Sequence, residues 1–103
     1  MSLSTYSKLV SEAVLADGDA CGVLICGTGL GMSMTANRYR GIRAAVCTDG
    51  YMARMARAHN DANILCLGER VLGPGLATEI VNIFLGTDFE GDRHLRRISI
   101  IDE

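Results

Sequence analysis

The chain has 103 residues, enough for one domain, and 49% of them are hydrophobic. That content excludes a disordered chain, and no apolar run approaches the roughly 20 residues that a membrane-spanning helix needs. A formal net charge of −2 argues against a nucleic-acid surface, which would require an excess of basic residues on one face. The N-terminus lacks the pattern of an export signal, so we expect a cytoplasmic protein.

The first half of the chain predicts a helix, a strand and a second helix. Apolar residues at helical spacing predict the first helix over 5–15, which the Asp17 to Asp19 turn ends. An uninterrupted apolar run bounded by glycine, Gly22 to Cys26, predicts a strand buried on both faces. A tight loop over 27–31 then leads into a helix over 32–40, which Gly41 closes.

The same unit recurs in the second half. The pattern predicts a strand over 42–47, a helix capped by Thr48 or Asp49 and running to His59, and a strand over 63–67. The next predicted helix opens at residues 73–75 and runs to residue 85, and a polar, arginine-rich tail follows it. Strands that alternate with helices need crossover connections, which predicts an α/β fold, a Rossmann-like three-layer sandwich with a parallel sheet. We expect a single domain over residues 1–103, with 1–3 as an expression remnant.

The cysteines and histidines give no sign of a structural metal. Most of the four cysteines lie in or at the end of apolar runs, which is typical of reduced thiols, and no Cys-x-x-Cys pair occurs. His59 and His94 do not complete a zinc-ligand spacing. We therefore expect no bound metal.

The loop over 27–31 suits an anion. Glycines at alternate positions, Gly27, Gly29 and Gly31, allow positive φ, so that successive N–H groups can converge on one ligand in front of a helix start. A phosphate or an oxyanion is the expected guest. A tight strand-to-helix turn without a ligand stays open as the alternative.

Three named phosphate motifs fail at this loop. The dinucleotide fingerprint needs glycine where Met32 or Met34 stands, although Asp49 lies where a ribose-binding acid would be expected. A Walker loop would need a lysine before Ser33, and a cysteine phosphatase loop would need arginine at position 32. A nucleotide-binding α/β domain that uses Asp49 remains an alternative.

Cys26 is the candidate reactive residue. At a strand end that faces glycine N–H groups and a helix start, its thiolate would be stabilised and could act as base or nucleophile. Cys47 and Cys66 lie within predicted strands and lack such neighbours, so we expect inert buried thiols there.

Several segments in register resemble ribose-5-phosphate isomerase B and the related galactose-6-phosphate isomerase subunits. The resemblance runs from about Tyr6 to the C-terminus, and its clearest segments are Ile25 to Ser33, Ala36-Asn37, Gly41 to Ala44, Ala58 to Asn63 and Phe89 to Arg97.

The resemblance implies an aldose–ketose isomerase of the pentose phosphate pathway that works through an enediolate, without metal or organic cofactor. Cys26 matches the family's general base, and Thr28 and His59 match residues associated with ring opening. The resemblance also implies a homodimer or a dimer of dimers, with the active site between subunits. The implied substrate-binding residues are Gly27, Gly29, Leu30, Gly31, Asn60, Arg70, Arg93, His94 and Arg97.

The resemblance has one departure. Family members begin with a strand that ends in an Asp-His pair, then a helix and a second strand, and nothing before Tyr6 matches them. We therefore expect a sheet without the family's first two strands. A non-catalytic truncated homologue, or one subunit of a hetero-oligomeric isomerase, stays open as an alternative. Without the resemblance, His59 would be a solvated or capping histidine, and Arg96 keeps the interpretation of an exposed charge.

Overall fold

The computed structural model describes residues 2–91 and 94–103. Within these ranges, no helix is both long and apolar enough to cross a bilayer. The elements are, in chain order, α1 (Leu3–Ala16), β1 (Gly22–Cys26), α2 (Leu30–Ala36), β2 (Ala44–Val46), α3 (Gly50–Ala58), β3 (Ile64–Gly68), α4 (Pro74–Gly86) and α5 (Leu95–Ile101).

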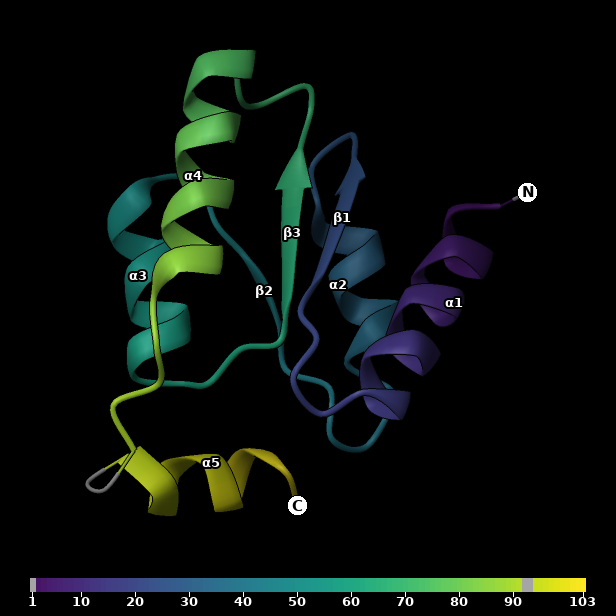
Figure 1. Ribbon diagram of the computed structural model, residues 1–103. Coiled ribbons are helices and arrows are strands. Elements are labelled where there is room, and N and C mark those ends of the chain that lie inside the picture. Colours follow the sequence, from purple (N-terminus) through teal and green to yellow (C-terminus); the bar gives the residue numbers. More distant parts are fainter. Residues whose placement is uncertain (1, 92–93) are drawn as a thin grey trace.

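The described strands form one parallel sheet between two layers of helices (Figure 1). The strand order is β1-β3-β2, and Cys26 at the end of β1 lies opposite Gly68 at the end of β3. Helices α1 and α2 pack together on one face, and α3 and α4 pack together on the other. The three-layer α/β sandwich predicted from the alternation of elements is confirmed, with the three strands that the pattern predicted.

Three features differ from the prediction. Strand β1 is not buried on both faces, because it lies at the edge of the sheet and Ile25 is 55% exposed. Helix α2 ends at Ala36 and not near residue 40, because the side chain of Asn37 turns to bond both the N–H and the C=O of Ala44. The arginine-rich tail, for which the sequence predicted no helix or strand, contains helix α5, which buries Ile98. A helix of seven residues with two arginines gives too short an apolar pattern to be recognised in the sequence.

The alternation of side chains along β1 and β3 produces two separate cores. Residues of one parity face α3 and α4, and residues of the other parity face α1 and α2. The buried members of the first core are Cys47, Ala53, Ala56, Ala62, Leu65, Leu67, Leu72, Ile80 and Phe84. Those of the second are Val14, Leu24, Cys26, Met32, Ala36, Ile42, Ile64 and Cys66. Cys26 therefore belongs to the core under α1 and α2.

Strand β1 has an open edge in the described structure, since β3 is its one strand neighbour. Hollows of about 320 and 390 Å³ lie on its two faces, and Ile25, 55% exposed, lines both. The other residues of the first are Leu67, Gly68, Glu69, Leu72, Pro74 and Ala77, and those of the second are Leu3, Tyr6, Val10, Val23, Leu24 and Met32. Apolar surface thus accompanies the unpaired edge on both sides.

Candidate active site

The thiol of Cys26 is held by the turn that follows it. Gly29 adopts a left-handed conformation with φ of 88°, which turns its N–H back to donate to Cys26 Sγ at 3.0 Å. The side chain of Cys26 is 8% exposed. A backbone N–H that points at sulfur stabilises negative charge on it. The sulfur of Cys26 therefore lies at the end of β1 with a backbone donor directed at it.

The loop rests on the backbone of β3. A Cβ added to Gly68 would lie 2.7 Å from backbone atoms of Thr28, and one added to Gly29 would lie 3.2 Å from the carbonyl carbon of Leu67. Only glycine allows such an approach at these two positions. The position of the Cys26 turn is therefore set by the carboxyl end of the neighbouring strand.

Arg70 is brought to the same place. The N–H groups of Glu69 and Arg70 donate to the carbonyls of Cys26 and Gly27 at 2.8 and 3.0 Å. The side chain of Arg70 passes over Gly27, where an added Cβ would lie 3.6 Å from its Cδ. Cys26, Thr28 and Arg70 thus gather at the carboxyl edge of the sheet, as parallel strands require of residues at their ends.

Two N–H groups of the loop are engaged within the protein. That of Gly29 donates to Cys26 Sγ, and that of Leu30 donates to Thr28 Oγ1 at 3.2 Å. The expectation that successive amides of 27–31 all face a ligand therefore does not hold for these two. Leu30 and Gly31 lie at the exposed start of α2, which is only seven residues long.

The thiols within the sheet differ from Cys26. Burial, with a contribution from Asp49, raises the pKa of Cys47 to about 11. Burial, with contributions from Cys26 and Cys47, raises the pKa of Cys66 to about 12. Both thiols stay protonated near neutral pH, which agrees with the inert role predicted for them. All four cysteines of the chain are free thiols.

A second group of predicted site residues lies around the end of α3. His59 is the C-cap of α3, Asn60 follows it at the surface, and His94 is the N-cap of α5. The two imidazole rings stack with centroids 4.2 Å apart and planes inclined by 19°. Arg97 lies one turn further along α5. Arg93, a predicted phosphate ligand, lies outside the described residues.

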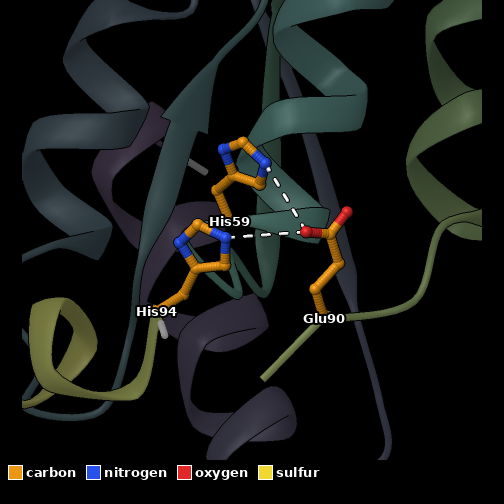
Figure 2. Close-up of side chains that lie close together, drawn as sticks. All are labelled: His59, Glu90 and His94. Carbon is orange, nitrogen blue, oxygen red and sulfur yellow. Dashed lines mark ion pairs between the residues drawn. The ribbon is translucent and has the colours of Figure 1, made fainter. Parts of the chain in front are cut away.

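Glu90 joins these histidines (Figure 2). Its Oε1 lies 3.7 Å from His59 Nε2 and 3.5 Å from His94 Nε2. No role for Glu90 was predicted from the sequence, although its spacing of four residues from His94 was available as a signal. A protonated imidazole at either position would form an ion pair with this carboxylate.

An ion-pair network fixes the turn that carries His59 and Asn60. Asp61, in a left-handed conformation with φ of 47°, lies 3.2 Å from an Nη atom of Arg43 and 2.9 Å from one of Arg57. The Arg43 Nε also donates to the carbonyl of Asp61 at 2.8 Å. The network was not predicted: Arg43 and Asp61 are 18 positions apart, although Arg57 and Asp61 have the i,i+4 spacing of neighbouring residues. It positions the turn between α3 and β3.

The two groups lie at opposite ends of the sheet (Figure 1). Cys26 is the last residue of β1, at its carboxyl end, whereas His59 precedes the amino end of β3. The five residues of β3 separate the two edges by about 13 Å at the usual rise per residue. One copy of the described chain therefore does not bring Cys26 and His59 into a single pocket.

Asp49 is used by the protein itself. It is the N-cap of α3, and its carboxylate accepts a hydrogen bond from Met52 N at 2.8 Å. Such a cap is a common role for aspartate at a helix start. The position that kept a nucleotide-binding domain open as an alternative thus has a structural role in this fold.

Comparison with known proteins decides the family. The model of the family described as Ribose/Galactose Isomerase matches residues 1–101. The chain belongs to the ribose/galactose isomerase family. It is 47% identical over 96 residues to Ribose-5-phosphate isomerase B of Escherichia coli, a match that covers 93% of this chain and 64% of that protein.

Two further family members show the range of the likeness. D-erythrulose-4-phosphate isomerase of Pectobacterium atrosepticum is 53% identical over 70 residues, which cover 68% of this chain and 46% of that protein. The solved structure of Clostridium thermocellum Ribose-5-Phosphate Isomerase B is 52% identical and superposes with a TM-score of 0.95 over 99% of this chain and 69% of that one. The chain thus spans about two-thirds of the length of the two ribose-5-phosphate isomerases that it matches.

Proposed function

We propose that this chain forms the cysteine-bearing part of a cofactor-independent aldose–ketose isomerase acting on a sugar phosphate, with ribose 5-phosphate as the first candidate. The observation that carries the proposal is the 3.0 Å hydrogen bond from Gly29 N to Cys26 Sγ at the carboxyl edge of the sheet. We place the enzyme in the cytoplasm, where its four free thiols stay reduced.

Cys26 would be the base of the reaction. Its thiolate removes the proton from C2 of the open-chain aldose phosphate, and the electrons of that bond form the enediolate. The same sulfur then returns the proton to C1, while a proton moves from the C2 hydroxyl to the C1 oxygen. A group that takes and returns one proton needs no cofactor, and a well-placed base contributes roughly 10²- to 10⁴-fold to the rate.

The remaining site residues would bind and open the sugar. Thr28, exposed at the same edge as Cys26, and His59 act on the ring oxygen and the anomeric hydroxyl, and Asn60 contacts the sugar hydroxyls. The phosphate binds to guanidinium groups, whose planar fork suits it. We assign this role to Arg70, Arg93 and Arg97, with His94 beside them. Gly27, Gly29, Leu30 and Gly31 enclose the enediolate.

The separation of the two groups supports a site made by two copies of the chain. A two-fold axis perpendicular to the strands reverses strand direction, so it can set the amino edge of one copy beside the carboxyl edge of the other. His59 of one subunit would then meet Cys26 of its partner. A homodimer, or a dimer of dimers, is therefore part of the proposal.

The open edge of β1 supports a further element of the proposal. The strand–helix–strand segment with which family members begin would add strands beside β1 and cover the apolar hollows on its two faces. Its Asp-His pair would then lie near Cys26. The alternative, a non-catalytic homologue or one subunit of a hetero-oligomer, is favoured by the same open edge.

The test is an isomerase assay on two proteins, namely the chain itself and the chain joined to the first strand–helix–strand segment of the Escherichia coli isomerase. Each is given ribose 5-phosphate, galactose 6-phosphate and erythrulose 4-phosphate. We expect turnover of ribose 5-phosphate by the joined protein, and a loss of roughly 10²-fold or more in Cys26→Ala. Cys21→Ala, at a half-buried thiol before β1, is the matched control. Full activity in Cys26→Ala would refute the assignment of the base, and inactivity of both proteins would favour the non-catalytic alternative.

A further inference from the structure

The described residues contain one cluster of potential metal ligands that the sequence did not reveal. His59, Glu90 and His94 each offer a ligand atom, and these atoms all lie within 4.8 Å of one another (Figure 2). They come from the end of α3, the connection after α4 and the start of α5. We infer that they form a binding site for a divalent first-row transition-metal ion, with zinc as the ion of choice.

The distances fit a shared ion. Zinc binds imidazole nitrogen and carboxylate oxygen at about 2.0 to 2.2 Å, so two ligands of a tetrahedral ion lie about 3.3 Å apart. Glu90 Oε1 lies 3.5 Å from His94 Nε2 and 3.7 Å from His59 Nε2. Movements of a few tenths of an ångström would bring these two pairs to ligand spacing, and the histidine ligand atoms, which lie within 4.8 Å of each other, would also approach on binding.

The donor set and its exposure also fit. Two imidazoles and one carboxylate are a known zinc-binding set that leaves a fourth position to water. Imidazole nitrogen selects zinc, nickel or copper over magnesium and calcium, which prefer oxygen ligands. His94 is 6% exposed and would act as the fixed ligand, whereas His59 and Glu90, 29% and 51% exposed, leave a path for the ion.

The backbone holds two of the three residues close together before any ion binds. The N–H of Glu90 donates to the carbonyl of Ala58 at 2.9 Å, which ties the connection after α4 to the end of α3. The N–H of His94 donates to the carbonyl of Gly91 at the same distance. The stacked rings are inclined by only 19°, so the two ring planes are nearly parallel. We expect the more exposed ring, His59, to tilt toward Glu90 on binding.

The site has a consequence for activity that rests on the proposed function. If His59 donates a proton during ring opening, a zinc ion on its Nε2 takes away that proton site and inhibits the isomerase. Metal binding itself does not depend on turnover. Binding and inhibition can therefore be measured separately, and the failure of one is distinguishable from the failure of the other.

The experiment titrates the full chain with cobalt chloride, followed by the visible absorption of bound Co²⁺, and with zinc chloride in competition with a chromophoric chelator. We expect one ion per chain, and binding about tenfold or more weaker in both Glu90→Gln and His59→Gln, because a lost ligand should cost at least as much as a lost supporting residue. Glu79→Gln, an exposed glutamate on α4, is the matched control, and Cys26→Ala tests whether thiols bind the ion instead. Circular dichroism verifies the fold of each variant.

The wild-type affinity should persist in Glu79→Gln and Cys26→Ala. An unchanged affinity in Glu90→Gln and His59→Gln would overturn the site, as would loss of binding in Cys26→Ala or the absence of binding at micromolar metal. Inhibition of a working isomerase by zinc, relieved by a chelator and weakened in Glu90→Gln, would extend the inference to regulation. Binding without inhibition would keep the metal site and reject the role of His59 Nε2 as the proton donor.

Discussion

Arg43 and Asp102 are 59 positions apart and form a forked ion pair in which one Nη atom of the arginine lies 2.9 and 3.0 Å from the two carboxylate oxygens. Arg43 precedes β2, and Asp102 is the C-cap of α5. The pair therefore ties helix α5, which begins after His94, to the residue that leads into β2. Asp61 contacts the same guanidinium at 3.2 Å, so the turn after His59 and the end of α5 share one anchor.

The first prediction concerns this anchor. Asp102→Asn should lower the free energy of unfolding by only about 1 kcal/mol, because Asp102 is 35% exposed and Arg43 keeps its pair with Asp61. The larger effect should be local, with faster amide hydrogen exchange in α5 than in the wild type. Urea unfolding and hydrogen exchange measure the two effects. Glu103→Gln, at the neighbouring exposed carboxylate, should change neither, and unaltered exchange of α5 in Asp102→Asn would contradict the anchoring role.

The second prediction concerns the support of the Cys26 turn. In Gly68→Ala the new Cβ would lie 2.7 Å from backbone atoms of Thr28, so the loop must shift. We expect a loss of about 1 to 3 kcal/mol in the free energy of unfolding. Urea unfolding measures it, and alkylation of Cys26, followed by mass spectrometry, reports the displaced turn.

Gly75→Ala provides the control for this variant. Gly75 lies in α4, and an added Cβ would meet nothing within 4 Å. Alanine is favoured over glycine in a helix by up to about 1 kcal/mol, so Gly75→Ala should leave stability unchanged or raise it. Equal stability of the Gly68→Ala and Gly75→Ala proteins would show that the loop does not rest on β3 as described.

Local patterns in the sequence were enough to predict most of the fold. Strand β1 has its predicted bounds because glycine precedes and follows an unbroken apolar run. The start of α3 was also correct, since Asp49 was one of two proposed caps. The end of α2 was not, because Asn37 is bound by the backbone of Ala44, a contact that local pattern does not report.

The candidate site was only partly predictable for the same reason. Cys26 ends β1 and Arg70 follows β3, and strand ends are visible in sequence. Glu90 is placed by a backbone contact with Ala58, 32 residues earlier in the chain. The stack of His59 on His94 depends on how α5 packs. Contacts of this kind follow from the assembled fold and leave no periodic signal.

The third prediction concerns pH. A thiol in the unfolded chain ionises near its ordinary pKa of 9.0, whereas in the folded chain Cys47 and Cys66 ionise near 11 and 12. Above pH 9 the unfolded state therefore binds fewer protons than the folded state, so stability falls as pH rises, by about 1.4 kcal/mol per pH unit for each thiol. Below pH 9 both thiols are protonated in the folded and the unfolded state, so their contribution to stability does not change with pH.

The measurement is urea unfolding at several values between pH 8 and pH 10, roughly one unit on either side of the ordinary thiol pKa. The protein with both Cys47→Ala and Cys66→Ala should be less stable at every pH, because methyl groups fill the thiol sites poorly, but its stability should fall less steeply above pH 9. Parallel slopes for the two proteins would contradict the raised pKa values. Alkylation of native protein at pH 8 should likewise spare both buried thiols.

The last prediction tests whether Cys26 and His59 serve one site from two subunits. In the joined, active protein, Cys26→Ala and His59→Asn should each be nearly inactive alone. When equal amounts are unfolded together and refolded, half of the dimers are mixed, and each mixed dimer holds one site with both an intact Cys26 and an intact His59. Activity should return to about a quarter of the wild-type value, as random pairing across a two-fold axis requires. Two variants of Cys26, Ala and Ser, refolded together provide the control and should stay inactive. If mixed dimers form but the mixture of Cys26→Ala and His59→Asn stays inactive, the two residues act within one subunit. That outcome would contradict the separation of Cys26 and His59 by the full length of β3.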